Sequence, residues 1–198
     1  MDSRFHQQID FLNQIDQLKH ILRKTRVLGG SRHENSAEHS WHLAVMAVIL
    51  SEYSSEPIDL NKVIRMLLIH DLVEIDAGDT FFFHSDARAD AVAKEQAAAK
   101  RIFGLLPADQ ASVFLALWEE FESSGSPEAR FAKAIDQYAP MLQNAANEGG
   151  TWKEFQVDYH TVLDKKKTVR EATPRLWEHT LELLDESHRN GHIEKFEL

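Results

Sequence analysis

A histidine and an aspartate stand side by side at His70 and Asp71, directly after the apolar run 67–69. The run predicts a buried helix, and a charged carboxylate inside such a helix is costly unless a cation meets it. A divalent metal ion would satisfy the carboxylate and would also bind the imidazole. His39 and Asp136 lie on two other predicted helices and can complete such a set. These four residues predict a metal-assisted hydrolase.

The ligand types limit which ion would bind. Two imidazoles and two carboxylates suit a first-row divalent ion and tolerate Mg²⁺ or Mn²⁺, and the chain has no cysteine that could supply a thiolate. Four protein ligands on a six-coordinate ion leave positions for water and for a substrate oxygen, which hydrolysis requires. The predicted cofactor is one divalent ion, with Mn, Co, Mg, Zn, Ni and Fe all left open.

Glu74 is a candidate general base. It follows His70 by four residues and Asp71 by three, so on one helix all three side chains can face the same way. A carboxylate in this position need not bind the ion and can instead accept a proton from the attacking water. His42 shares a helical face with His39, so one of these two histidines could be the ligand and the other a core residue.

Simpler interpretations exist for most of these residues. The His70-Asp71 pair could be a helix-terminal ion pair, and Asp136 could pair with Lys133, three residues earlier. Asp79 could serve simply to stabilise the turn that precedes it, and Arg32 could simply form an ion pair with Glu34 or Glu38. The run 165–167, three consecutive lysines, is most simply a solvated helix face.

Composition narrows the class of partner. The chain has 198 residues, of which 43% are hydrophobic, and a net charge of −10. This charge argues against a nucleic-acid polymer as partner, but a metal ion and a few arginines can still hold a small phosphorylated ligand. The sequence shows no signal peptide and no membrane span, which predicts a cytoplasmic protein.

Hydrophobic periodicity predicts an all-α protein. Helical spacing covers residues 8–24, 37–53 and 59–75, and further helices are expected from 86, 107, 127 and 174 onward, with no strand periodicity. Asn35, Asp59, Ser126 and Thr173 are the expected N-caps. We expect one domain over residues 1–198, with its core over about 10–185, and seven to nine helices. The aromatic run 81–83 is expected in the core or a dimer contact.

Three segments in order resemble a known family. Residues 32–41 read RHENSAEHSW, residues 70–79 read HDLVEIDAGD, and Asp136 follows on a later helix. Together they are similar to the H…HD…D pattern of HD-domain metal-dependent phosphohydrolases, and to the R-x-E-N-x-A-E-H-S and H-D-x-x-E-x-x-x-G-D segments of the branch that holds 5′-deoxynucleotidases. The resemblance covers roughly residues 10–185.

The resemblance implies a fold, a cofactor and residue roles. It implies a helical bundle that binds one divalent ion and often forms a homodimer. Glu74 would assist the attacking water, and Asp79 would lie in the substrate pocket near the sugar or the leaving oxygen. The implied metal ligands are His39, His70, Asp71 and Asp136.

The chain departs from the family in one region. Related nucleotidases carry an Arg-Trp pair for the phosphate and the base, whereas residues 22–27 here read LRKTRV, without a tryptophan. A cation can still hold the phosphate, and the candidates are Arg23, Lys24, Arg26 and Arg32. The base-stacking role has no candidate.

The preferred function is that of a metal-dependent phosphomonoesterase acting on a small phosphorylated metabolite, with a deoxynucleoside 5′-monophosphate as the preferred substrate. A guanosine-tetraphosphate-type pyrophosphohydrolase or a cyclic-nucleotide phosphodiesterase is the alternative within the same fold. A regulatory module that binds metal and nucleotide without turnover is the alternative of a different class.

Overall fold

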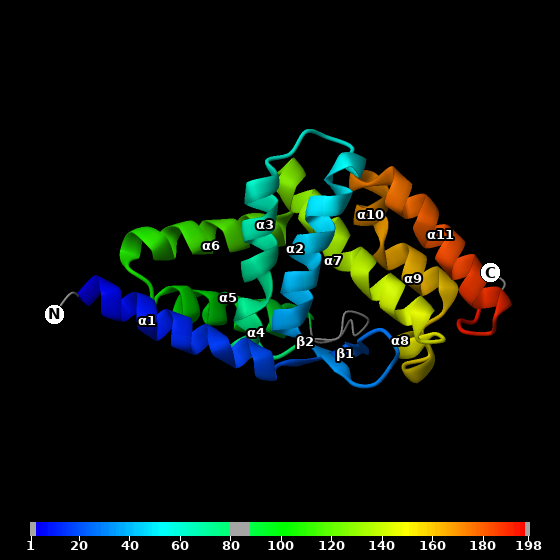
Figure 1. Cartoon of the computed structure of the whole chain (residues 1–198), viewed down its shortest axis with the longest axis horizontal. Helices are drawn as coiled ribbons and strands as arrows, with labels where there is room; N and C mark the ends of the chain where they lie inside the picture. The colour runs from blue at the N-terminus through cyan, green and yellow to red at the C-terminus, as the bar shows by residue number, and fades with distance from the viewer. Residues whose placement is uncertain (1–2, 80–87, 197–198) are drawn as a thin grey trace.

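The structure, a computed structural model, describes residues 3–79 and 88–196, and within these ranges the chain is helical apart from one small sheet (Figure 1). The α-helical segments are α1 (Ser3–Ile15), α2 (Ser36–Leu50), α3 (Leu60–Ile69), α4 (Glu74–Ala77), α5 (Arg88–Phe103), α6 (Ala108–Ser123), α7 (Pro127–Ala146), α8 (Gly150–Glu154), α9 (Tyr159–Lys165), α10 (Lys167–Ala172) and α11 (Pro174–Arg189). Three 3-10 segments, η1 (Asp16–His20), η2 (Ser51–Tyr53) and η3 (His70–Val73), join them. The all-α prediction is confirmed. The aromatic run 81–83 lies outside the described residues.

Helix α7 is the centre of the molecule. It crosses the middle of the view in Figure 1 and contacts α2, α3 and α6 on one side and α10 and α11 on the other. Its sequence explains this position, because small alanines allow close approach of neighbouring helices while larger apolar side chains fill the core. The fully buried members include Ala129, Phe131, Ala132, Ala134 and Ile135.

All four predicted helix starts are confirmed, and at three of them the N-cap side chain bonds to the helix. Asn35 forms a capping box with Glu38 at the start of α2, Asp59 accepts hydrogen bonds from backbone N–H groups of α3, and Ser126 accepts one from α7. Thr173 is different. It precedes α11, but its Oγ1 donates to the carbonyl oxygen of Val169 at 2.8 Å and does not cap the helix.

The expected helix over residues 8–24 is wrong in its second half. Helix α1 ends at Ile15, and after η1 the chain forms an antiparallel hairpin of β1 (Leu22–Arg26) and β2 (His33–Asn35). Gly29 and Gly30 adopt positive φ angles of 86° and 67°, which lets the chain reverse. Pairing between the two strands then satisfies the backbone and overrides the weak helical spacing of this segment.

The predicted helix over 59–75 is divided. Helix α3 ends at Ile69, η3 carries His70–Val73, and α4 begins at Glu74. The short helices α8, α9 and α10 are further segments that periodicity did not resolve. The described residues therefore contain eleven α-helical segments, more than the expected seven to nine.

Helix α2 leaves one face open. Leu43 and Ala47 are fully buried, whereas the side chains on the opposite face, Trp41, Val48 and Ile49, are 52–64% exposed. None of the helices in the described ranges is long and apolar enough to cross a membrane. The cytoplasmic location stays a prediction.

Candidate functional site

Three of the four predicted ligands meet at one point. His39 comes from the first turn of α2, His70 from η3 and Asp136 from the middle of α7, and one ligand atom of each lies within 4.8 Å of the others. His39 Nε2 is 3.0 Å from Asp136 Oδ1, and His70 Nε2 is 3.8 Å from the same oxygen. Segments far apart in the sequence therefore converge on a volume the size of one ion.

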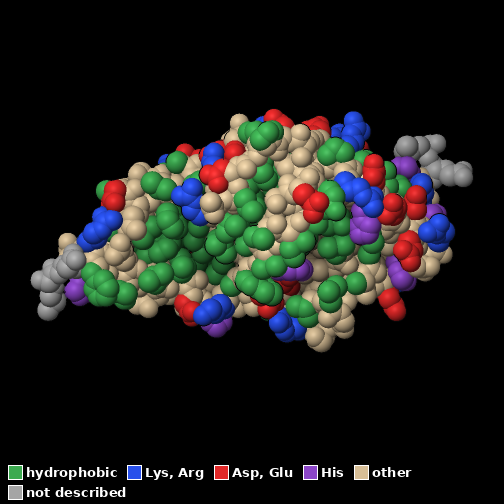
Figure 2. Space-filling view, turned by 45° about the horizontal axis from the view of Figure 1, so that its top comes forward, with side chains coloured by type: hydrophobic (Ala, Val, Ile, Leu, Met, Phe, Trp, Pro, Cys, Tyr) green, Lys and Arg blue, Asp and Glu red, His purple; other side chains and the backbone are tan. Residues whose placement is uncertain are grey.

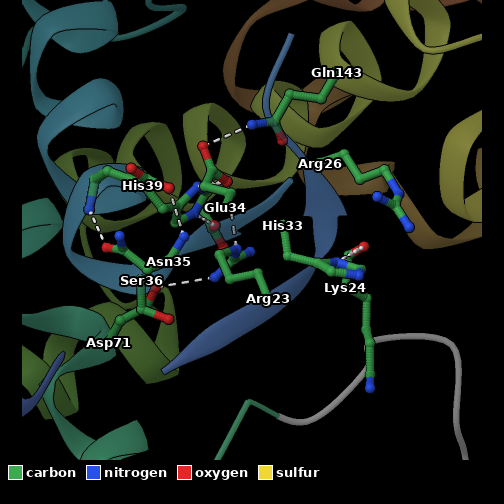
Figure 3. Close-up of polar contacts among 12 residues, drawn as sticks. Arg23, Lys24, Arg26, His33, Glu34, Asn35, Ser36, His39, Asp71 and Gln143 are labelled. Carbon is green, nitrogen blue, oxygen red and sulfur yellow. Dashed lines mark hydrogen bonds and ion pairs between the residues drawn. The ribbon is translucent and has the colours of Figure 1, made fainter. Parts of the chain in front are cut away.

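Asp71 borders the same volume. Its Oδ1 lies 3.0 Å from His70 Nε2, and its Oδ2 accepts a hydrogen bond of 3.0 Å from Arg23 Nη1 (Figure 3). The carboxylate is buried, with 7% of the residue exposed. Asp71 thus faces the metal cluster with one oxygen and a basic side chain with the other.

The histidine environments favour a cation at this point. His70 Nδ1 lies 2.9 Å from the carbonyl oxygen of Leu67, which fixes the proton on Nδ1 and directs the Nε2 lone pair toward Asp71 and Asp136. Within the described part of the chain the buried Nε2 atom of His70 has no hydrogen-bond partner. A lone pair that faces two carboxylates is repelled unless a positive charge lies between them, so these residues fit a divalent ion.

The charges agree with this geometry. Burial lowers the pKa of His70, but Asp71 and Asp136 outweigh it and raise the pKa well above the ordinary histidine value. Burial raises the pKa of Asp136, but hydrogen bonds and charge interactions with His39 and His70 hold it well below its usual range. The carboxylate oxygens of the cluster therefore favour a positive charge between them. A metal ion can supply this charge while both imidazoles stay neutral.

Glu74 lies beside the cluster at the start of α4. Its Oε2 accepts a hydrogen bond of 2.6 Å from Ser36 Oγ, on the N-terminal residue of α2. Burial raises the pKa of Glu74 well above its ordinary value, and the nearby carboxylates of Asp71 and Asp79 add to this effect. A carboxyl group with a raised pKa next to a metal cluster is suited to accept a proton from a water molecule and to release it again.

A cavity of about 180 Å³ opens against these residues. Acidic, basic, polar and apolar side chains line it. They are Arg23, Lys24, Thr25, Asp71, Glu74, Asp79, Asp136, Pro140, Met141, Asn144, Thr151, Trp152 and Lys166. A larger cavity of about 540 Å³ lies between α8 and the C-terminal segment, but no member of the metal cluster lines it. We assign the chemistry to the smaller cavity because the ligand set lies there.

Two of the four predicted phosphate-binding residues line this cavity. Arg23 and Lys24 on β1 do so. Arg26 instead donates to the carbonyl oxygen of Gly30 across the hairpin at 3.4 Å. Arg32 is exposed, and its Nη2 donates to Glu38 Oε2 at 2.8 Å. The geometry therefore does not bring Arg26 and Arg32 to the cavity, and the exposed Arg32–Glu38 pair corresponds to the simple ion pair that Arg32 could form.

Lys166 is a cavity residue that sequence reasoning missed. The lysine run 165–167 was expected to be solvated, yet Lys166 is only 5% exposed and lines the cavity. Burial, assisted by the charge of Arg23, lowers its pKa to about 8 even though Asp136 acts in the opposite direction. Helical spacing could have indicated that Lys166 points inward. It lies four residues after Val162 and three before Val169, and both valines are fully buried.

Glu34 is the second missed residue. It lies in β2, where burial alternates, so its side chain points inward while those of His33 and Asn35 are partly exposed. Only 3% of the residue is exposed, and its Oε2 lies 3.2 Å from His39 Nδ1. From the sequence, Glu34 was considered only as a possible ion-pair partner of Arg32.

Comparison with known proteins agrees with this site. A family model described as an HD domain matches residues 15–177. The chain is 31% identical to the 5′-deoxynucleotidase HDDC2 of Homo sapiens over 141 residues, which cover 71% of this chain and 68% of that protein. It is 32% identical to HDDC2 of Mus musculus over 139 residues, covering 70% and 68%.

A solved structure supports the same assignment. The crystal structure of a predicted metal-dependent phosphohydrolase from Magnetospirillum magnetotacticum MS-1 has a TM-score of 0.93 to this chain at 47% identity, covering 98% of this chain and 97% of that one. The family model and the human relative each span more than two thirds of the chain. This chain therefore belongs to the HD-domain family of metal-dependent phosphohydrolases, as its sequence motifs predicted.

Proposed function

We propose that this protein is a metal-dependent phosphomonoesterase that removes phosphate from a deoxynucleoside 5′-monophosphate. The observation that carries the proposal is the convergence of His39, His70 and Asp136, with Asp71 at their side, on a cavity that also holds a candidate base and basic side chains. Relatives called 5′-deoxynucleotidase support the choice of substrate class.

The residues of the site have separate roles in the proposed reaction. His39, His70, Asp71 and Asp136 would hold a divalent ion, which would lower the pKa of a water molecule and polarise a phosphate oxygen. Glu74 accepts the proton of the attacking water, and the hydroxyl of Ser36 holds the Glu74 carboxylate in place through its 2.6 Å hydrogen bond.

Basic residues of the cavity bind the phosphate in this proposal. Arg23 is the main candidate, because it is largely shielded, with 14% of its side chain exposed, and is kept fully charged by Asp71, Glu74, Asp136 and Asp79, which raise its pKa against the effect of burial. Lys24 and Lys166 add positive charge to the lining of the same cavity. Basic groups in a partly desolvated cavity bind a phosphate more strongly than they would in open solvent.

The remaining lining suits a nucleoside. Asp79 can accept a hydrogen bond from a sugar hydroxyl, and the apolar side chains of Pro140, Met141 and Trp152 offer contact for a base. The indole comes from α8 and not from the segment after the first helix, where related nucleotidases carry it. Gly150 helps to place α8, because a Cβ there would lie 2.5 Å from Asn144 Oδ1, the acceptor for the backbone N–H of Thr151.

A nucleotide panel tests the reaction. The purified protein, supplied with Mn²⁺, Co²⁺ or Mg²⁺, is expected to release orthophosphate from deoxynucleoside 5′-monophosphates, and Asp71→Ala is expected to abolish the release. Asp164→Ala is the matched control, because Asp164 is exposed and does not line the cavity. Full activity of Asp71→Ala would contradict the proposal.

Product identity separates the alternatives. A guanosine-tetraphosphate-type enzyme would release pyrophosphate, and a cyclic-nucleotide phosphodiesterase would release a linear nucleotide without orthophosphate. A regulatory module would show a higher Tm with metal and nucleotide but no product. A spare carboxyl group at Glu74 favours catalysis over simple binding, because metal binding alone does not need it.

We also propose a homodimer formed through the open face of α2. Figure 2 shows a broad band of hydrophobic side chains on the half of the molecule that holds the N-terminus. On α2 the exposed apolar residues Trp41, Val45, Val48 and Ile49 follow helical spacing along one stripe. A stripe along a single helix is self-complementary across a two-fold axis, which suits a second copy of the chain. Light scattering is expected to give twice the monomer mass, and Ile49→Glu is expected to give the monomer.

A further inference from the structure

Glu34 occupies a buried position between the metal cluster and the basic side of the cavity. Its Oε1 accepts a hydrogen bond of 2.6 Å from Gln143 Nε2, and its Oε2 lies 3.2 Å from His39 Nδ1 and 3.7 Å from Arg23 Nε (Figure 3). It does not line the cavity, so it does not touch a substrate there. A buried carboxylate is costly unless its neighbours satisfy it. Among the described residues Gln143 donates a hydrogen bond to Glu34, while His39 and Arg23 face Oε2 at ion-pair distance without a hydrogen bond.

His39 lies between two carboxylates that compete for its ring proton. Glu34 faces Nδ1 at 3.2 Å, and Asp136 faces Nε2 at 3.0 Å. If the proton were on Nε2, it would occupy the direction of the metal cluster and block that nitrogen as a ligand. A carboxylate at Nδ1 favours the tautomer with the proton on Nδ1, which leaves the Nε2 lone pair for an ion shared with Asp136.

Arg23 is held by the same carboxylate from another side. Its Nη1 donates to Asp71 Oδ2 at 3.0 Å, and its Nε faces Glu34 Oε2 at 3.7 Å. Two carboxylates on two edges fix the plane of a guanidinium group more strongly than one does. Oε2 of Glu34 is therefore the point where the metal side and the proposed phosphate side of the site meet.

Gln143 anchors this arrangement to the central helix. It lies seven residues after Asp136 on α7, which places both side chains on the same face of that helix two turns apart. One rigid helix thus carries a metal ligand and also the donor that holds Glu34. The hydrogen bond between Gln143 and Glu34 is buried, so it keeps its strength.

We propose that Glu34 is a positioning residue that sets the metal-binding tautomer of His39 and at the same time orients Arg23. The Arg23 part rests on the proposed function, because it concerns binding of a phosphate. The His39 part concerns metal binding alone, so it can be tested without measuring turnover.

The test is Glu34→Gln. A glutamine keeps the shape and can still accept from Gln143, but it presents no charge to His39 and can offer an N–H to Nδ1, which favours the wrong tautomer. Calorimetric titration of the metal-free protein with Mn²⁺ is expected to show affinity weaker by about 10- to 100-fold. Histidine ¹⁵N NMR of the metal-free protein is expected to show a smaller share of the Nδ1–H form of His39 in Glu34→Gln than in the wild type.

Three further variants keep the test decisive. Glu122→Gln is the control for loss of one negative charge, because Glu122 is an exposed partner of Lys133 on the surface, and it is expected to bind Mn²⁺ like the wild type. Glu34→Asp retains the charge and is expected to bind Mn²⁺ more tightly than Glu34→Gln. If Glu34→Gln does not fold, the comparison of Glu34→Asp and Gln143→Met with wild type replaces it, and both are expected to show weaker metal binding.

The outcomes separate the claims. Wild-type Mn²⁺ affinity and an unchanged His39 tautomer in folded Glu34→Gln, or wild-type Mn²⁺ affinity in both replacement variants, would overturn the proposal. In an active enzyme, Glu34→Gln is also expected to raise KM for the nucleotide through Arg23. If the wild type hydrolyses no nucleotide, the proposed function fails, while the NMR and calorimetric results still decide the role of Glu34 at His39.

Discussion

The metal side and the phosphate side of the cavity are built from different kinds of element. On the metal side, His39 and Asp136 lie within α2 and α7, and His70 lies in η3 directly after α3, all packed into the main core. On the phosphate side, Arg23 and Lys24 lie on a hairpin, and Lys166 lies at the junction of α9 and α10. Rigid packing can hold the ligand atoms of one ion within a few tenths of an ångström, whereas the phosphate side tolerates more variation because several basic groups share the charge.

This difference leads to a ranking of effects. A change on the metal side removes an atom for which the site has no substitute, and a change on the phosphate side removes one of several charges. The loss of activity is therefore expected to be largest for the metal ligands, smaller for the base Glu74 and smaller again for the basic residues that line the cavity. The smallest loss is expected for Arg32, which does not line the cavity.

The largest loss is expected for Asp136→Ala. The variant leaves His39 and His70 without the oxygen that lies 3.0 and 3.8 Å from their Nε2 atoms. Since loss of a partner of a ligand alone costs about 10- to 100-fold in affinity, loss of the ligand is expected to weaken metal binding by more than about 100-fold. Calorimetry with Mn²⁺ measures this. Wild-type affinity would remove Asp136 from the ligand set.

Glu74→Gln is expected to lower kcat by about 100- to 10,000-fold while it leaves metal binding nearly unchanged. Glu74 is needed to accept the proton and is not needed to hold the ion. Parallel measurement of kcat and Mn²⁺ affinity checks this separation. Equal losses in both would make Glu74 a ligand and not a base.

The same variant is expected to raise the Tm of the metal-free protein. Because the pKa of Glu74 is raised on folding, the folded state binds more protons than the unfolded chain above the ordinary glutamate pKa. Stability is therefore lost as the pH rises from the ordinary pKa through the raised one, and glutamine avoids this loss. Thermal unfolding of both proteins at pH 8 measures the difference, and a lower Tm for Glu74→Gln would contradict the assigned pKa shift.

Lys166→Met is expected to act mainly on KM. Loss of one of three basic groups on the cavity wall is expected to raise KM for the nucleotide about tenfold, which corresponds to about 1.4 kcal/mol of binding free energy. In the wild type, Lys166 loses its charge as the pH passes about 8, so KM is expected to rise there. Lys166→Met is expected to lack this rise, and Lys167→Met, at an exposed neighbour, is the control. A pH-independent KM in the wild type would exclude Lys166 from phosphate binding.

The smallest effect is expected for Arg32→Ala. Arg32 is exposed and pairs with Glu38, and exposed pairs of this kind contribute little. The kcat/KM of Arg32→Ala is expected to match that of the wild type. Arg23→Ala, at a largely shielded arginine of the same hairpin, is expected to lose most of its activity. Steady-state kinetics of the two variants measure this difference. An equal loss of kcat/KM in Arg32→Ala and Arg23→Ala would contradict the conclusion that only Arg23 acts in the cavity.

The sequence predicted the metal side more fully than the phosphate side, for a physical reason. His70 and Asp71 follow an apolar run, and Asp136 lies among apolar neighbours, so each is a polar residue in a context that normally excludes it. Such residues need a partner, and a metal ion is the partner that three of them can share. Chemical type and context made them candidate ligands without coordinates, and the structure brings His39, His70 and Asp136 together.

Basic residues carry no such signal. Arg23 and Arg32 are the same residue type nine positions apart, and only the hairpin decides that Arg23 faces the cavity while Arg32 faces solvent. The hairpin itself could not be predicted, because residues 16–24 combine helix-like spacing with strand pairing that depends on residues 33–35. Lys166 was missed because its two neighbours are also lysines, and only its place between buried valines distinguishes it.

Anomalous diffraction from crystals grown with Mn²⁺ tests the central claim most directly. One anomalous peak per chain is expected at coordination distance from the Nε2 atoms of His39 and His70 and from carboxylate oxygens of Asp71 and Asp136. A protein that binds Mn²⁺ elsewhere, or that shows no peak between these four side chains at saturating Mn²⁺, would contradict the account.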